Sequence, residues 1–246
     1  MSVSAKKYVN DGQTWEDYWR KVQEGRVGAP PWNWDPEQAA HCYLSQRGEH
    51  CDPALPLVDV GCGDGFLTHY LARTHGQVVG TEISAAALQQ AQATHAAANI
   101  SYEPLDITDT EAARALHDRL GDANVHLRGV LHAIEAPDRR RAVSALAVLA
   151  GERGTVFDIE ISPALDAAQA SAAASFGALP ERMQQVGSSG LRAQRISLED
   201  LVGLYQEAGC AVRACGETSG RSSMRLPDGS CFVYPMVYVL VTAGEM

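Results

Sequence analysis

The sequence predicts an α/β fold: a seven-stranded, mostly parallel sheet with helices on both faces and an antiparallel last strand. From about residue 56 onward, apolar strand-like runs alternate with single helical stretches. That alternation is typical of parallel strands joined by helical crossovers. The last two strand-like runs have no helix between them, so they form a hairpin-like ending that places one antiparallel strand in the sheet. We therefore expect a Rossmann-like sheet with a modified end.

The first half of the sheet is expected to contain three short strands and three helices. The helix after the first strand has Phe66, Leu67, Tyr70 and Leu71 on one face, and Ser84 caps an Ala-rich helix that reaches Ala98. Thr108, with Glu111 three residues later, fits the capping-box pattern at the start of the third helix. The predicted strands are 57–61, 77–81 and 100–103, and the predicted helices are 64–74, 84–98 and 108–120.

The second half is expected to contain four strands and two further helices. Pro137 lies near the first turn of one helix, where its missing N–H costs nothing, and this helix ends near Gly151. Ser197 caps the other, which ends at Gly209. The predicted strands are 125–132, 155–161, 210–215 and 231–242, with a polar connection between the last two.

Two segments lie outside this alternation and are long for connections in an α/β domain. We expect residues 1–55 to be an N-terminal segment that covers cofactor and substrate, and 56–246 to be the main domain with an insertion at 162–196. Long insertions of this kind usually act as lids. The acceptor pocket is expected to use the N-terminal segment, the insertion and the 217–230 connection.

Composition and charge exclude several classes of protein. The 246 residues carry a formal charge of −10, whereas nucleic-acid binders need a surplus of cations, so we expect no nucleic-acid partner. The N-terminus has no apolar signal-like run, and no run is long enough to span a bilayer. The six cysteines lack CxxC spacing, which favours a cytoplasmic protein with reduced thiols and no metal site. The sequence does not indicate an oligomeric state.

The strongest motif is the acidic, glycine-rich loop that follows the first strand, 58–67 (VDVGCGDGFL). Gly61, Gly63 and Gly65 allow a sharp turn and a close approach of the backbone to a ligand. A dinucleotide fingerprint would need a further glycine where Phe66 stands, which argues against NAD. Asp59 and Asp64 would repel a pyrophosphate but suit the ammonium group of S-adenosylmethionine, so this cofactor is expected.

Acidic residues after the next two strands complete the expected cofactor site. Glu82 can accept hydrogen bonds from two ribose hydroxyls, with Ile83 beside it in the same site. Asp106 can accept a hydrogen bond from the adenine amino group while Ile107 covers the ring. Together with the loop, these residues resemble the class I methyltransferases over residues 56–161.

Two further segments are similar to the thiopurine S-methyltransferase family. One is the Trp-containing stretch 14–32 (TWEDYW, then GRVGAPPW), and the other is 128–139, with an Arg-Gly pair before an apolar run. This resemblance implies that Trp19 and Trp32 help to form the wall of the cofactor pocket and that Arg128 lies at the cofactor. The family's Phe-His pair is replaced here by 29–32 (APPW), so the resemblance leaves the acceptor undetermined.

Together these features predict a methyltransferase that acts on a small molecule. A thiol acceptor follows from the resemblance, and nitrogen, oxygen or carbon of a metabolite is the alternative. A low-pKa thiol needs no base, whereas a hydroxyl or protonated amine does. His132 is the expected catalytic base, with Glu135 and Glu160 as secondary candidates. An NAD-dependent oxidoreductase and a non-catalytic cofactor-binding protein are the competing interpretations.

Overall fold

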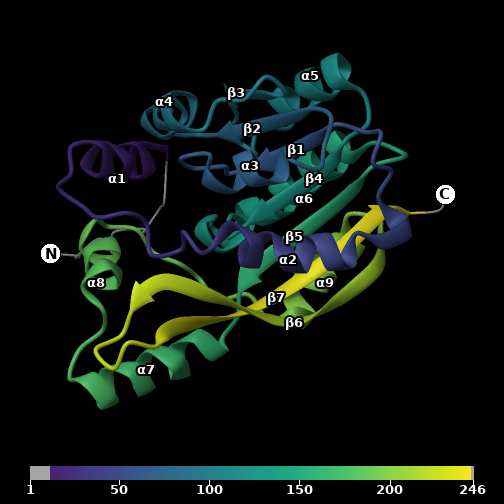
Figure 1. Ribbon diagram of the computed structural model, residues 1–246. Coiled ribbons are helices and arrows are strands. Elements are labelled where there is room, and N and C mark those ends of the chain that lie inside the picture. Colours follow the sequence, from purple (N-terminus) through teal and green to yellow (C-terminus); the bar gives the residue numbers. More distant parts are fainter. Residues whose placement is uncertain (1–11, 245–246) are drawn as a thin grey trace, which may run out of the picture.

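In the computed structural model, which describes residues 12–244, seven strands form one sheet in the order β3-β2-β1-β4-β5-β7-β6 (Figure 1). The strands are β1 Leu57–Val60, β2 Val78–Glu82, β3 Ile100–Pro104, β4 Asn124–Arg128, β5 Thr155–Ile161, β6 Cys210–Arg225 and β7 Cys231–Ala243. β7 pairs antiparallel with β5 and β6, and strands β1 to β5 pair in parallel. The predicted fold class is confirmed.

Helices cover both faces of the sheet. Those of the described residues are α1 Gly12–Gln23, α2 Pro36–Gln46, α3 Phe66–Leu71, α4 Ala85–Thr94, α5 Thr110–Leu120, α6 Ala136–Ala150, α7 Ala164–Phe176, α8 Glu181–Ser188 and α9 Leu198–Glu207, with 3-10 turns η1 Gly48–His50 and η2 Leu131–Ala133. The core on one face includes residues of α5, α6 and α9, and the core on the other includes α2, α3 and α7. Because both faces are covered, every residue of β1 and β2 is buried.

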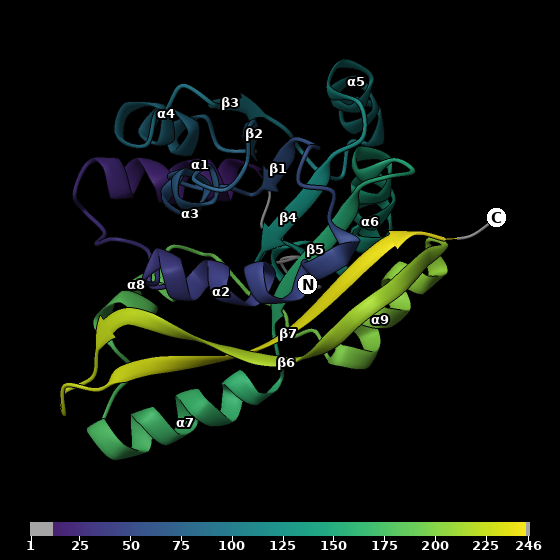
Figure 2. The ribbon, with the colours of Figure 1, turned by 45° about the vertical axis from the view of Figure 1, so that its right-hand side comes forward.

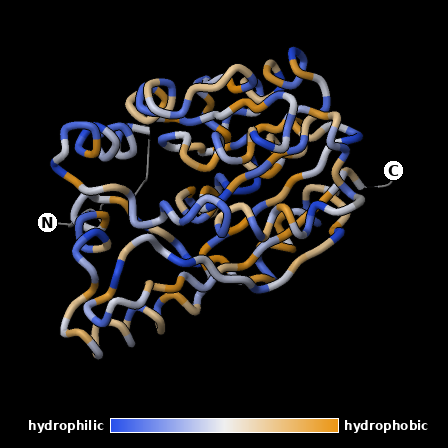
Figure 3. Tube along the Cα trace, in the orientation of Figure 1, coloured by the Kyte–Doolittle hydropathy of each residue, from blue (hydrophilic) through white to orange (hydrophobic). Residues whose placement is uncertain are grey.

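Hydropathy follows this layering. In Figure 3 the hydrophobic stretches run mainly along the central strands, whereas α1 and α8 are largely hydrophilic. Within residues 12–244, no helix is both long and apolar enough to cross a membrane.

Two of the three predicted helix caps are confirmed. Ser84 accepts a hydrogen bond from the Ala87 N–H, and Ser197 accepts one from the Asp200 N–H. The prediction for Thr108 is wrong, because Asp109 caps α5 and accepts from two backbone N–H groups. Thr108 instead donates its hydroxyl to Asp106 at 2.7 Å, since the turn after β3 uses the aspartate as its acceptor.

The C-terminal hairpin is longer than predicted. β6 continues to Arg225, so most of the polar connection expected at 216–230 is strand. Its residues alternate between exposed and more buried positions, as expected for a strand with one covered face, and this period-2 pattern was missed in the polar sequence. Figures 1 and 2 show the hairpin extending beside α7, which β7 contacts.

The fourth strand is shorter than predicted. β4 ends at Arg128, and His132 lies in η2 rather than at the end of the strand. Gly129 has φ +76, a left-handed conformation that interrupts the extended backbone. The chain therefore turns at Gly129, and three consecutive backbone N–H groups after the turn point toward one carboxylate, described below.

The segments outside the strand–helix alternation contribute helices α1, α2, α7 and α8. α1 is attached to the start of α4, because the Glu16 carboxylate accepts from the Ser84 hydroxyl at 2.8 Å and the Ala86 N–H at 3.0 Å. α7 and α8 form most of the 162–196 insertion. Residues 1–11 of the predicted covering segment lie outside the described residues. The predicted boundary between an N-terminal covering segment, residues 1–55, and a main domain, residues 56–246, stays a prediction.

Candidate active site

A cavity of about 700 Å³ lies at the carboxyl ends of β1, β2 and β4. The order of the sheet reverses between β1 and β4, and ligands of open α/β sheets bind at such a crevice. The loops after these strands, helix α1 and the insertion all contribute lining residues. Its lining residues fall into two groups along the chain: those of the glycine-rich loop and the neighbouring strand ends, and those of the insertion and β7.

The glycine-rich loop leaves no room for side chains at two of its positions. Gly61 has φ +68, and a Cβ there would lie 2.5 Å from Val130. Gly63 has φ +56, and a Cβ there would lie 2.9 Å from the Trp19 ring. Both glycines line the cavity, as does Asp64, whose carboxylate accepts from the Asn33 amide at 2.9 Å. The loop therefore presents bare backbone to any ligand in the cavity.

Glu82 is a buried carboxylate fixed by the backbone at the end of β2. One oxygen accepts from the N–H groups of Ile83 at 2.8 Å and Ser84 at 3.1 Å, and the other accepts from Gly63 at 3.1 Å. Burial raises the pKa of Glu82, against the effect of these hydrogen bonds. The residue lines the cavity beside Ile83, an exposed large apolar side chain. A fixed acceptor and an apolar surface thus stand side by side.

Asp106 and Ile107 lie at the adjacent edge of the cavity. One Asp106 oxygen accepts from the Thr108 N–H at 2.9 Å and from its hydroxyl, which holds the side chain in place. Ile107 is buried and contributes an apolar contact to the lining. The structure therefore brings Glu82, Ile83, Asp106 and Ile107 together as the sequence predicted.

Asp59 and Gly65 do not line this cavity. The buried Asp59 carboxylate accepts from the Thr68 hydroxyl at 2.5 Å and bonds to the His126 ring at 2.8 Å. It supports the loop from beneath instead of facing a ligand. Gly65 is the N-cap of α3, and a Cβ there would meet Tyr102. The acidic loop residue that reaches the cavity is Asp64.

Arg128 places a cation at the end of β4. Its guanidinium donates to the Trp32 carbonyl at 2.9 Å and stacks over the Trp34 ring at 4.6 Å. Burial lowers the pKa of Arg128 to about 10, which still leaves it charged at neutral pH. Its Nε has no hydrogen-bond partner within residues 12–244, although the side chain lines the cavity. Such an unpaired donor fits an anionic ligand group.

Aromatic side chains of the N-terminal segment form one wall of the cavity. Trp15, Trp19 and Trp32 line it, and Tyr18 packs behind them with its ring 5.5 Å from that of Trp32. The cluster is held on α4 through Ala86 and Ala87. The Trp pair of α1 therefore does more than pack the helix onto the core, since it also closes the cavity.

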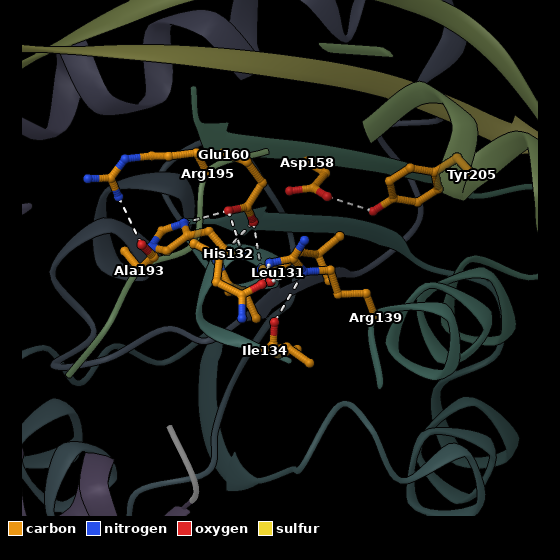
Figure 4. Close-up of polar contacts among 11 residues, drawn as sticks. Leu131, His132, Ile134, Arg139, Asp158, Glu160, Ala193, Arg195 and Tyr205 are labelled. Atoms are coloured by element: carbon orange, nitrogen blue, oxygen red, sulfur yellow. Dashed lines mark hydrogen bonds and ion pairs between the residues drawn. The ribbon is translucent and has the colours of Figure 1, made fainter. Parts of the chain in front are cut away.

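His132 and Glu160 form a pair in which the carboxylate is completely buried (Figure 4). Glu160 accepts from the imidazole Nδ1 at 2.6 Å and also from the backbone N–H groups of Val130, Leu131 and His132. Burial acts to raise the pKa of Glu160, but the neighbouring His132 and these hydrogen bonds outweigh it and lower the pKa. In neutral His132 the proton therefore sits on Nδ1, and Nε2 carries the lone pair.

The lining residues from the insertion and β7 are mostly apolar. Together with Trp34, the residues with apolar side chains are Ile161, Leu165, Met183, Leu191, Tyr234 and Met236. The lining contains no residue of the 217–230 connection that the sequence analysis expected there. That prediction is wrong, because β6 continues through most of this segment and β7 supplies the contacts.

Comparisons with known proteins agree with this geometry. Residues 57–154 match the family model described as a methyltransferase domain. A crystal structure of an S-adenosylmethionine-dependent methyltransferase from Anabaena variabilis is 30% identical, with a TM-score of 0.90 over 99% of both chains.

The chain belongs to the S-adenosylmethionine-dependent methyltransferases. Uncharacterised methyltransferases of Mycobacterium bovis and Mycobacterium tuberculosis are 36% identical over 120 residues, which is 46% of this chain. The match spans 57% of the length of these curated relatives. A magnesium protoporphyrin IX methyltransferase from Synechocystis, solved with S-adenosylhomocysteine bound, has the same fold at 18% identity and a TM-score of 0.59, covering 96% of this chain and all of the other.

The residues of this methyltransferase fit the family's cofactor on structural grounds. The loop at Gly61 and Gly63 has no side chains and leaves space for a ligand. The fixed Glu82 carboxylate can accept hydrogen bonds from ribose hydroxyls, and the unpaired Arg128 Nε can donate to a ligand carboxylate. Among the described residues, no three His, Cys, Asp or Glu side chains are grouped as metal ligands. Tyr234 and Met236 of the lining were not predicted from the sequence, because their positions depend on the length of the C-terminal hairpin.

Proposed function

We propose that this protein transfers a methyl group from S-adenosylmethionine to a weakly acidic hydroxyl of a small, largely apolar molecule. The observation that carries the proposal is the buried Glu160 carboxylate bonded to His132 in a cavity that also contains the cofactor loop. A thiolate acceptor would have no use for this pair. The thiol implied by the thiopurine S-methyltransferase resemblance therefore becomes the second candidate.

The cofactor is proposed to lie along the glycine-rich loop with its ribose at Glu82. Ile83 and Ile107 would cover the adenine, and Asp106 would accept from its amino group. The methionine part would reach toward Arg128, which can pair with its carboxylate, while Asp64 and loop carbonyls accept from its ammonium group. Trp19 and Trp32 would close the pocket above it. Asp59 and Gly65 would act indirectly, by supporting the loop.

The bound cofactor supplies a methyl group on a positively charged sulfur, an already activated donor. The chain's own residues then have to position the acceptor, exclude water and take a proton. The methyl carbon would form its new bond to the acceptor oxygen, and the electron pair of the broken sulfur–carbon bond would stay on sulfur. Nε2 of His132 accepts the hydroxyl proton, and Glu160 stabilises the resulting imidazolium.

The acceptor is proposed to be neutral and to bind beneath the insertion. Arg195 lines this part of the cavity, but its charge is already paired with Asp166 at 2.8 Å. Apolar side chains supply most of the remaining surface, including Leu165 and Met236. The acidic chain does not favour a nucleic-acid substrate. The six cysteines are free, which suits the cytoplasm, where we propose that the protein acts.

A panel of methyl acceptors tests the proposal. Phenols, aromatic thiols, amines and indoles are incubated with S-adenosylmethionine, and formation of S-adenosylhomocysteine is followed. We expect turnover with a phenol and a loss of at least a hundredfold in His132→Gln, because a positioned base contributes about 10²- to 10⁴-fold. Turnover of thiols alone, unaffected by His132→Gln, would refute the hydroxyl assignment. No turnover on any class, despite cofactor binding, would favour a non-catalytic binding protein.

A further inference from the structure

A second carboxyl group lies beside Glu160 and takes no part in the chemistry described so far. Asp158 and Glu160 are two residues apart on β5, so both side chains project from the same face of the sheet, and both residues are 0% exposed. Figure 4 shows the Asp158 carboxyl between Glu160 and Tyr205. Glu160 was predicted as a secondary base candidate, whereas its pairing with Asp158 depends on which face of β5 the two side chains occupy.

The two oxygens of Asp158 have different surroundings. Oδ2 accepts from the Tyr205 hydroxyl of α9 at 3.0 Å. Oδ1 is buried and has no donor within residues 12–244. If Asp158 were ionised, its negative charge would be buried with one oxygen lacking a hydrogen-bond donor, and the Glu160 carboxylate would repel it as well. A proton on Asp158 removes both penalties.

Glu160 is the member of the pair that is able to stay ionised. It already accepts four N–H groups, whereas Asp158 accepts one hydroxyl among the described residues. Burial and the neighbouring Glu160 raise the pKa of Asp158 well above its ordinary value. The other charged or titratable groups that face the pair are His132 of η2, Arg139 of α6 and Tyr205 of α9.

We propose that Asp158 is a protonated positioning residue for His132: a neutral acid, held by Tyr205, that leaves a single negative charge facing the imidazole. The inference rests on the proposed function of His132 as the base. A single negative charge orients the imidazole and stabilises the imidazolium that forms when Nε2 takes a proton. A second negative charge would stabilise the imidazolium further and so weaken the imidazole as a base.

The test measures the pKa of His132 in the free protein by NMR, with the His132→Gln spectrum identifying its signal among the eight histidines. Asp158→Asn replaces a neutral acid by a neutral amide of the same shape, so we expect the His132 pKa to stay within about 0.3 units of the wild-type value. Were Asp158 ionised, Asn would remove a negative charge, and the pKa would fall by about one unit or more. Such a fall would overturn the proposal.

Two further variants keep the result interpretable. Asp158→Val, paired with Tyr205→Phe so that no hydroxyl is left unpaired, removes the carboxyl and its partner. We expect the His132 pKa to rise or stay, because the variant removes a neutral group but no charge, whereas a fall contradicts the proposal. In Glu160→Gln the pKa should fall by about one unit or more, since the remaining charge is lost. An unchanged value there would also overturn it.

The titration does not depend on turnover, so the inference and the proposed function fail separately. If no acceptor is methylated but the His132 pKa is the same in Asp158→Asn as in the wild type, the proposed function is wrong while the assignment of Asp158 as a neutral acid is supported. If turnover is found, the acid limb of the pH profile of kcat/KM should follow the NMR pKa in each variant. A profile that moves independently of that pKa would show that Asp158 has no effect through His132.

Discussion

Replacing Glu160 by glutamine should damage both stability and activity, and the damage can be worked out from its contacts. Oε1 accepts from the N–H groups of Val130 at 2.9 Å and Leu131 at 2.7 Å, and Oε2 accepts from the His132 N–H at 3.1 Å and Nδ1 at 2.6 Å. A glutamine turns one of these oxygens into an NH₂ group. If the NH₂ replaces Oε1, the N–H groups of Val130 and Leu131 lose their acceptor. If it replaces Oε2, the His132 N–H loses its acceptor, and Nδ1 keeps a partner only in the tautomer without a proton on Nδ1.

A buried donor without an acceptor costs about 1–3 kcal/mol, so one or two of them should lower the free energy of unfolding by about 1–6 kcal/mol. Denaturation in urea measures this loss. The value for kcat should fall by at least a hundredfold, because the imidazole loses the group that orients it and stabilises its charged form.

Glu207→Gln is the matched control for this variant. Glu207 bonds to Arg140 at 2.8 Å on the surface, and both side chains are exposed. Its replacement should change stability by less than about 0.5 kcal/mol, because exposed ion pairs contribute little. If Glu160→Gln were as stable and active as this control, the buried carboxylate would not organise the turn after β4, and the reasoning about His132 would be refuted.

Three further predictions concern the cofactor side. Glu82→Gln should weaken S-adenosylmethionine binding about 10- to 100-fold by calorimetry, since a hydrogen bond to a charged group and the contact with the Gly63 N–H are lost. Glu103→Gln is the control and should not weaken binding, because this partly buried carboxylate pairs with Arg119 and does not line the cavity. Gly63→Ala should also weaken cofactor binding, because residue 63 has φ +56 and an added Cβ would lie 2.9 Å from the Trp19 ring. Normal affinity in this variant would contradict the claim that the cofactor lies along the loop. Although burial opposes it, hydrogen bonds from the Ala86 N–H, Ser84 and Arg20 lower the pKa of Glu16. The stability that Glu16 contributes to the attachment of α1 is therefore fully present above its unfolded-state pKa of about 4.3. It is lost as the pH falls through the lower pKa that Glu16 has in the folded protein. Tryptophan fluorescence should report this loss in the wild type but not in Glu16→Gln.

Local signals in the sequence were sufficient for the sheet and for the cofactor loop. The strand at 155–161 and the caps at Ser84 and Ser197 were predicted correctly, because short-range hydrogen bonding and apolar runs determine them. Glu82 and Asp106 follow consecutive strands of a parallel sheet, so their meeting at one edge follows from topology alone.

The predictions that failed depended on tertiary contacts. Asp59 was expected to face the ligand, but Thr68 and His126 bond to it from below, and sequence spacing does not reveal these partners. Asp158 and Glu160 alternate with Phe157 and Ile159 along β5, and the face that the two carboxyl groups occupy depends on the packing of α6 and α9. The hairpin was predicted too short because its exposed, polar residues hide a period-2 pattern that only the pairing with β7 makes clear.

Calorimetry on the purified protein tests the central claim most directly, with S-adenosylmethionine, S-adenosylhomocysteine and NAD as separate titrants. The loop at 61–64 and the Glu82 carboxylate should bind the first two, and both affinities should fall in Glu82→Gln but not in Glu103→Gln. NAD should produce no saturable heat at millimolar concentration. Binding of NAD in their place, or no binding of either adenosyl compound, would contradict the assignment of this cavity.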